Sequence, residues 1–251
     1  MIDFHSHFLP KIDDGAKNLE ESLEMLRISK ESGVDTVIST SHCYAFGGES
    51  DIKHFLEKRN SAYSQVLNAI RGNIDTYPEI VLGCEVHLVP KLSTLPSLPR
   101  LCIENTDYIL IEMPSSDWND EDFEEVYQIT KLGLKPIIAH IDRYFDKEDK
   151  FSDLFSLNLL FQANAESFLS RDLRKKLSEL FRKDALHIIG SDMHGIVSRP
   201  PNLAEAYTVI ENKFGKIYAG YLNFASQKIL KNEPVPAPRL PKLGLLKKLT
   251  L

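Results

Sequence analysis

Residues 187–194 of the chain read HIIGSDMH, a short apolar run followed at once by an aspartate and a histidine. The segments YILIE at 108–112 and PIIAH at 136–140 have the same form. Consecutive apolar residues over four to six positions indicate strands of a parallel sheet that are buried on both faces. The carboxyl ends of such strands meet on one face in an α/β barrel, so the polar residues behind these runs are candidates for one site.

Seven apolar segments of this kind alternate with longer amphipathic ones. We predict strands near residues 1–4, 35–40, 79–84, 107–111, 135–139, 159–163 and 186–190. This alternation predicts right-handed βαβ units and a parallel sheet, either closed or doubly wound. The length of 251 residues suits one large domain or two small ones, and single α/β barrels are often of this size.

Three helices carry clear sequence signals. The segment NLEESLEMLRISKESG begins with Asn18 as a candidate N-cap and ends with Gly33 as a candidate stop. Residues 119–133 repeat this arrangement, with acids in the first turn and Gly133 at the end. Residues 167–184 form the third predicted helix. Pro200 or Pro201 fits the first turn of a later one.

Charge and cysteine content limit the possible partners and the compartment. The formal net charge is -6, which gives no long-range attraction to nucleic acid or to an anionic membrane. No stretch approaches the roughly 18 apolar residues of a membrane span. The three cysteines show no CxxC spacing, so we expect a reducing, cytoplasmic environment. From the net charge and the lack of a long apolar stretch, we expect no nucleic-acid partner and no stable membrane insertion. The oligomeric state is left open.

Histidines and carboxylates follow six of the seven predicted strands. These residues are His5, His7, His42, Glu85, Glu112, His140, Asp192 and His194. Imidazole and carboxylate together suit Mn, Fe or Zn, and the absence of thiolates disfavours a structural zinc site. Eight candidate ligands exceed the need of one ion, so we predict two or three ions bridged by a carboxylate. Such a centre favours metal-assisted hydrolysis of a phosphate ester.

Other polar residues near the same edge leave alternatives open. Asp13 and Asp14, beside a glycine, form either a turn or part of a metal site. Arg143 and Arg199 follow two of the strands, and each either binds phosphate or forms a surface ion pair. The remaining histidines do not share the pattern, and we expect structural or surface roles for His54, His87 and His187.

Several other phosphatase and hydrolase motifs are absent from the sequence. None of the cysteines Cys43, Cys84 and Cys102 has an arginine six positions later, so the Cys-x5-Arg phosphatase loop is missing. The G-x-x-x-x-G-K-[ST] and G-x-S-x-G motifs are also missing. A cysteine nucleophile is therefore disfavoured, and Cys43 and Cys84 are expected to pack against the core or the helices.

From residue 2 to about residue 232, the chain resembles a known bacterial family. The resemblance is carried, in order, by DFHSHFLPKIDDGA, TSHCY, GCEVHL, ILIEMP, PIIAHIDRY, QANAESF, IIGSDMHG and RPPNLAEAY. These segments look like the protein-tyrosine phosphatases of the CpsB/YwqE type, which belong to the polymerase-and-histidinol-phosphatase (PHP) superfamily. The resemblance implies a distorted (β/α)7 barrel with three metal ions, usually manganese.

The resemblance also implies a role for each matching residue. One ion would be held by His5, His7, Glu85 and Asp192, a second by Glu85, Glu112 and His140, and a third by Asp14, His42 and His194. Arg143 and Arg199 would bind phosphate. Our own hypothesis for the mechanism is a metal-bridging hydroxide as the nucleophile, and the sequence does not assign the general acid, for which His42 and His194 are the candidates. The implied substrate is phosphotyrosine on the tail of a cognate tyrosine autokinase that controls capsular or exopolysaccharide export.

Two departures from the family pattern and two rival functions remain. Ser41, Ile141 and Asp142 stand where the family commonly has TPH and HPERY, which puts the direction of Arg143 in question. One rival is a phosphoesterase acting on a small phosphomonoester such as histidinol phosphate, or on a nucleic-acid phosphodiester. The other is a non-catalytic module that binds the kinase or the export machinery.

The sequence predicts one barrel domain over residues 1–232 and a tail over 233–251. The tail is rich in proline and then becomes basic and apolar. Its cations either touch a membrane surface or a partner, or are simply solvated: Arg239, Lys242, Lys247 and Lys248.

Overall fold

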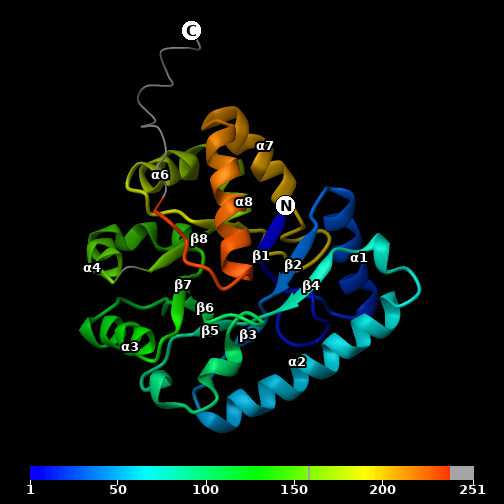
Figure 1. The fold of residues 1–251 in the computed structure, drawn as a ribbon, viewed down its shortest axis with the longest axis horizontal. Coiled ribbons are helices and arrows are strands. Elements are labelled where there is room, and N and C mark those ends of the chain that lie inside the picture. The colour runs from blue at the N-terminus through cyan, green and yellow to red at the C-terminus, as the bar shows by residue number, and fades with distance from the viewer. Residues whose placement is uncertain (158, 238–251) are drawn as a thin grey trace.

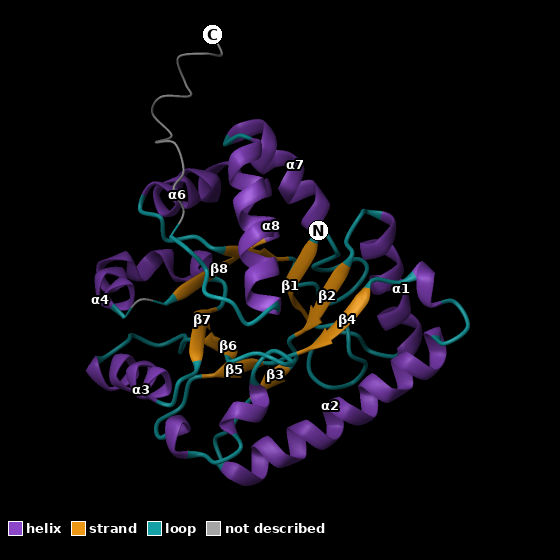
Figure 2. Ribbon diagram, in the orientation of Figure 1, coloured by secondary structure: helices purple, strands orange, loops and turns teal. Residues whose placement is uncertain are grey.

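The computed structural model describes residues 1–157 and 159–237, in which a curled parallel sheet is surrounded by helices (Figures 1 and 2). The strands are β1 (Ile2–Ser6), β2 (Thr36–Ser39), β3 (His42–Cys43), β4 (Glu79–Leu82), β5 (Glu85–His87), β6 (Tyr108–Glu112), β7 (Lys135–Ile138), β8 (Leu160–Asn164) and β9 (Ile188–Gly190). Every pair of neighbouring strands is parallel.

Nine strands fill the seven predicted positions because two of the predicted strands are interrupted. The strand expected at 35–40 continues into β3, and the strand expected at 79–84 continues into β5. The order is β1-β2-β4 in one sheet and β3-β5-β6-β7-β8-β9 in the other. The backbone N–H of Asp192 donates to His5 O at 2.7 Å, and that of His7 donates to Met193 O at 3.0 Å. These bonds join the first strand to the last, so the distorted (β/α)7 barrel is confirmed.

The helices form an outer layer around the strands (Figure 2). They are α1 (Leu19–Glu31), α2 (Glu49–Ile70), α3 (Asp120–Lys131), α4 (Phe151–Ser156), α5 (Ala165–Leu169), α6 (Arg171–Arg182), α7 (Leu203–Lys213) and α8 (Lys216–Leu230). A run of 3-10 turns, Ile141–Lys150, follows β7. The larger apolar cluster lies between strands and helices, and a second fills the barrel interior. Ala225 and Ile229 of α8 join the interior cluster beside Ile2 and Tyr108, at the amino end of the strands.

The predicted helix boundaries are right for α1 and α3. Asn18 Oδ1 accepts from the backbone N–H of Glu21 at 2.8 Å, and Gly33 has φ +92° after the last turn of α1. Gly133 plays the same part after α3, with φ +83°. Both glycines adopt the left-handed conformation that ends a helix at low cost.

The boundaries of two later helices were predicted wrongly. The helix expected over 167–184 is broken at Ser170, which is extended and whose hydroxyl accepts from the backbone N–H of Leu173 at 3.5 Å. A serine that caps a new helix competes with continuation of the old one. Pro200 and Pro201 precede α7, which begins only at Leu203. In the segment before them, the backbone N–H of His194 donates to Arg199 O at 2.9 Å, and Arg199 has the non-helical φ of 52°.

The first residues of the predicted tail contact the barrel. The hydroxyl of Tyr108 donates to Glu233 O at 2.8 Å, and that of Tyr221 donates to Pro236 O at 3.2 Å. The basic positions Arg239, Lys242, Lys247 and Lys248 lie outside the described residues. Among the described helices, none combines the length and the apolar character needed to cross a membrane.

The three cysteines are free thiols buried in the described structure. Burial raises the pKa of Cys43 and of Cys102 to about 12, so neither thiol is ionised near neutral pH. The expected packing of Cys43 and Cys84 against the core is confirmed.

His187 has the structural role expected of it, and it makes the fold sensitive to acid. Its Nδ1 accepts from the backbone N–H of Phe161 at 3.1 Å, and burial lowers its pKa to about 4. In the unfolded chain the imidazole of His187 binds a proton below about pH 6.5, whereas in the folded protein it does so only below about pH 4. The free energy of unfolding therefore falls as the pH is lowered from 6.5 to 4.

We therefore expect urea unfolding to show a contribution from His187 of about 2 kcal/mol between pH 7 and pH 5. The variant His187→Asn keeps an acceptor but cannot titrate, so its free energy of unfolding should fall by that much less over the same interval. Equal losses in the two proteins would contradict the role given to His187.

Candidate metal centre

The candidate ligands converge at the carboxyl ends of the strands, and the first strand changes its alternation to bring two of them there. β1 pairs Asp3 with Val37 but Ser6 with Ser39, so three steps along β1 match two along β2. Such a bulge reverses which side chains face inward. Phe4 therefore joins the apolar interior, while the next residue, His5, already faces the other candidate ligands.

Two glycines let the backbone come close to the histidines of β1. A Cβ atom on Gly190 would lie 2.4 Å from His5 Cβ and 2.5 Å from His5 N. A Cβ atom on Gly15 would lie 2.0 Å from His7 O. Both distances are far below van der Waals contact, so a larger residue at either position must displace a candidate ligand.

The replacement Gly190→Ala is expected to lower the free energy of unfolding by about 2 kcal/mol or more, because β1 and β9 must separate. It should also weaken Mn²⁺ binding about tenfold or more, since His5 moves. Urea unfolding and calorimetric Mn²⁺ titration measure the two effects. Gly72→Ala is the matched control, because a Cβ atom there meets nothing within 4 Å. Unchanged Mn²⁺ affinity in Gly190→Ala would contradict the placement of His5.

Three residues of the site have unusual backbone conformations. His140, Asp192 and Arg199 have φ of 30°, 54° and 52°, in the left-handed region that non-glycine residues seldom adopt. Each such residue costs of order 1 kcal/mol and persists only where its surroundings hold it. Here the backbone N–H of His140 donates to Gln162 Oε1 at 2.6 Å. The left-handed backbone at His140, Asp192 and Arg199 thus directs their side chains toward one another.

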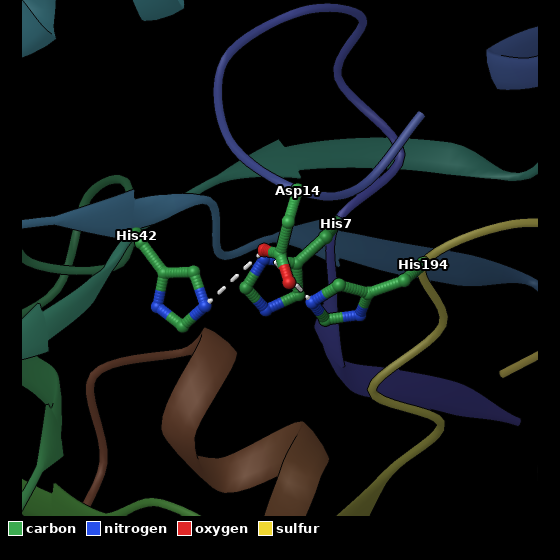
Figure 3. Close-up of side chains that lie close together, drawn as sticks. All are labelled: His7, Asp14, His42 and His194. Atoms are coloured by element: carbon green, nitrogen blue, oxygen red, sulfur yellow. Dashed lines mark ion pairs between the residues drawn. The ribbon is translucent and has the colours of Figure 1, made fainter. Parts of the chain in front are cut away.

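The candidate ligands form three overlapping groups. The groups are His7, Asp14, His42 and His194 (Figure 3); His5, His7 and Asp192; and His42, Glu85 and Glu112. Within each group the possible ligand atoms all lie within 4.8 Å of one another. His140 Nε2 lies 2.6 Å from Glu85 Oε1 and 3.6 Å from Glu112 Oε1. The structure therefore brings all nine residues together, and Glu85 lies between several of them.

The arrangement of nitrogen and oxygen atoms fits bound cations. His5 Nε2 and His7 Nε2 face each other at 3.0 Å, and they lie 3.1 and 3.3 Å from the same oxygen, Glu85 Oε2. Among the described residues, the buried atoms His42 Nδ1 and His194 Nε2 form no well-aligned hydrogen bond, although they lie 3.1 Å from Glu85 Oε2 and 3.3 Å from Asp14 Oδ1. Lone pairs of imidazoles and carboxylates that converge on one space suit Mn, Fe or Zn ions. The donor set therefore matches a transition-metal centre.

The pKa values of the candidate ligands also indicate a site that attracts cations. Although burial opposes ionisation, His5 and His140 hold the pKa of Glu85 well below its usual value. Burial also opposes a charge on His7 and His140, yet neighbouring carboxylates raise the pKa of His7 to about 10 and that of His140 to about 9. The carboxylates thus attract positive charge strongly, and protons and metal ions compete for these imidazoles.

Residues behind the candidate ligands hold them in place. Asp13 Oδ2 lies 2.8 Å from His7 Nδ1 and also accepts from the backbone N–H of His42 at 2.9 Å. Asp14 Oδ1 lies 3.6 Å from His42 Nε2 and 3.3 Å from His194 Nε2. The two neighbouring aspartates therefore differ in role: Asp13 orients imidazoles, and Asp14 faces the same space as they do.

Sequence reasoning missed Gln162 and the contact made by His87. Gln162 Oε1 lies 3.1 Å from His5 Nδ1 and accepts from the backbone of His140, so it orients two candidate ligands. A glutamine within an apolar strand was the only available signal. His87 Nδ1 lies 2.9 Å from Glu112 Oε2 and fixes that carboxylate. His54 lies on α2, where it lines a surface groove.

Both candidate phosphate-binding arginines reach the edge of the group. Arg143 and Arg199 each form an ion pair with Asp192 Oδ2, and both remain partly exposed. Asp142, one of the departures from the family pattern, is buried and accepts from the backbone N–H of Asn164 at 2.8 Å and from Ser167 Oγ at 2.6 Å. This departure leaves Arg143 directed at the candidate metal centre.

Comparison with known proteins places this arrangement in a family. The family described as "Capsular polysaccharide synthesis, CpsB/CapC" matches residues 1–231. The chain belongs to the CpsB/CapC family. Among the members it is similar to, tyrosine-protein phosphatase CpsB from Streptococcus agalactiae is 32% identical, and the match covers 92% of this chain and 99% of that protein. Tyrosine-protein phosphatase YwqE from Bacillus subtilis is 25% identical, and the match covers 94% of this chain and 93% of that protein.

Solved structures agree with the CpsB/CapC assignment. A crystal structure from work on YwqE of Bacillus subtilis and CpsB of Streptococcus pneumoniae, described as unique metal-dependent tyrosine phosphatases, superposes with a TM-score of 0.80. The match has 25% identity and covers 95% of this chain and 97% of that one. The lactonase Lmo2620 from Listeria monocytogenes, with a TM-score of 0.51 and 10% identity, shares the fold alone.

Proposed function

We infer that this CpsB/CapC protein is a metal-dependent tyrosine-protein phosphatase. The observation that carries the inference is the set of three overlapping His/Asp/Glu groups at one end of the barrel, with two arginines paired to Asp192 at its edge. Similar chains that span nearly all of this one are tyrosine-protein phosphatases, and one is described as metal-dependent.

The residues would hold up to three ions, with manganese the first candidate and iron or zinc the alternatives. The sets are His5, His7, Glu85 and Asp192; Glu85, Glu112 and His140; and Asp14, His42 and His194. When bound, such ions activate water at neutral pH and neutralise charge on phosphoryl oxygens. Glu85 is central to the proposal, because its two oxygens face different imidazoles, at 3.1 Å from His5 Nε2 and 2.6 Å from His140 Nε2.

Arg143 and Arg199 would bind the phosphate of the substrate. Both guanidinium groups form ion pairs with the same oxygen, Asp192 Oδ2. A guanidinium can also donate two parallel hydrogen bonds to a phosphate. Charge spreads over the three equatorial oxygens of the phosphoryl group during transfer, so donors placed there stabilise the transition state.

The leaving phenolate of tyrosine needs little help, because its conjugate acid has a pKa near 10. His42 and His194 were candidates for the general acid. Burial lowers the pKa of His42, and it lowers that of His194 to about 4. A low pKa disfavours proton donation, and His42 Nε2 and His194 Nε2 lie 3.6 and 3.3 Å from Asp14 Oδ1, so we assign both residues to the metal centre.

The proposed physiological substrate is phosphotyrosine on the tail of a tyrosine autokinase that controls capsular or exopolysaccharide export. The family's description as capsular polysaccharide synthesis proteins supports this choice. The test compares turnover of a phosphotyrosyl peptide, histidinol phosphate and single-stranded DNA by the Mn²⁺-loaded protein. We expect the peptide to have the highest kcat/KM. A preference for histidinol phosphate or DNA would reassign the substrate, and no turnover of any would favour a non-catalytic kinase-binding module.

A further inference from the structure

The chain leaves the candidate metal centre through a segment with two unusually exposed aromatic side chains. In the sequence HCYAF at 42–46, Cys43 and Ala45 are 0% and 2% exposed, whereas Tyr44 and Phe46 are 45% and 74% exposed. This alternation is that of an extended strand, in which every second side chain lies on the same face. His42, Tyr44 and Phe46 therefore form one row, which begins at a candidate metal ligand and ends in solvent.

The rings of this row pack against one another. The centroids of His42 and Tyr44 are 5.3 Å apart at an angle of 26°, and those of Tyr44 and Phe46 are 5.9 Å apart at 6°. His87 supports the row from the side, with centroid distances of 5.5 Å to Tyr44 and 5.6 Å to Phe46. The same His87 contacts Glu112, so His87 connects the aromatic row to the candidate metal centre.

Local hydrogen bonds hold the row in position. His42 pairs with Glu85, and Cys43 with Val86, in the parallel register of β3 and β5. Beyond Phe46, the backbone N–H of Gly47 donates to Asp51 Oδ2 at 2.6 Å, and that of Gly48 donates to Ala45 O at 3.0 Å. A segment tied at both ends presents its rings in one arrangement, which lowers the entropy lost when a ligand binds.

We propose that Tyr44 and Phe46 bind the aromatic ring of the phosphotyrosine substrate and so determine specificity for aryl over alkyl phosphates. The inference rests on the function proposed above. A phosphate held at His42 and its neighbours leaves the ester's aromatic ring directed outward, along the row of rings. Exposed, nearly parallel rings offer offset stacking to such a ligand, and burying Phe46 beneath it removes apolar surface from water.

The test separates ring binding from phosphate binding in the Mn²⁺-loaded protein. In Phe46→Ala we expect KM for a phosphotyrosyl peptide to rise about five- to tenfold, with kcat changed less than about twofold. The inhibition constant of phenylphosphonate should rise by the same factor, whereas that of inorganic phosphate should not change. Phe46→Tyr should restore the wild-type values. Phe224→Ala, which removes another exposed phenylalanine on α8, serves as the control and should change none of them.

Three outcomes would overturn the inference. One is unchanged KM and phenylphosphonate inhibition in Phe46→Ala, given an active wild-type enzyme. Another is an equal loss of phenylphosphonate and inorganic phosphate binding, which would mean that the metal centre itself was disturbed. The third is a change in molar mass by light scattering with unchanged KM, which would assign the row to contact between copies of the chain. A wild-type protein without phosphotyrosine turnover would instead overturn the proposed function.

Discussion

Replacing Glu85 by glutamine is expected to lower kcat/KM for a phosphotyrosyl peptide by about 10³-fold or more. Glu85 lies within 3.3 Å of His5, His7, His42 and His140, so one substitution weakens two of the proposed ion sites at once. A metal centre contributes several kcal/mol to stabilising transition-state charge, and each 1.36 kcal/mol is a factor of ten in rate. Steady-state kinetics and metal analysis of the same preparation measure the effect.

The metal content of Glu85→Gln should fall together with its activity. Glu57→Gln, on the exposed face of α2, is the matched control and should leave both unchanged. Full metal content with normal turnover in Glu85→Gln would show that this carboxylate does not bridge the ions.

Removing either arginine should reduce activity while sparing the metal. We expect Arg143→Ala and Arg199→Ala each to lower kcat/KM by about 10²-fold, the typical cost of losing one donor to a transition-state oxygen. Arg199→Lys should lose less than Arg199→Ala, because lysine keeps the charge but not the paired donors. The metal content should stay at the wild-type value in all three variants, in contrast to Glu85→Gln.

The control for these substitutions is Arg27→Ala. Arg27 forms ion pairs with Glu24 and Glu31 on the exposed side of α1, and it has no proposed role in the reaction. If Arg143→Ala and Arg199→Ala behaved like Arg27→Ala, neither arginine would be a phosphate-binding residue.

The convergence of the candidate ligands was predictable because parallel strands end at one edge. An apolar run such as PIIA, followed by His140, contains both the strand and the candidate ligand in five residues. Glu112 after YILI works in the same way. These patterns are local, since burial on both faces of the sheet makes nearly every residue of the strand apolar.

The features that sequence could not predict depend on contacts between distant segments. The bulge in β1, which turns His5 toward the other candidate ligands, exists only in its pairing with β2. The different roles of Asp13 and Asp14 follow from where His7 and His42 lie, and neighbouring aspartates look alike in a sequence. Gln162 gains its role only when β8 pairs with β7 and its side chain reaches His5 of β1.

The most direct test of a metal-dependent phosphatase is a metal titration of the chelator-treated protein, followed on a phosphotyrosyl peptide. We expect activity to be negligible after chelation and to rise with bound Mn²⁺ until two or three ions are bound per chain. Fe²⁺ and Zn²⁺ added in the same way identify which metal supports turnover best. Full activity with less than one transition-metal ion per chain would contradict the account.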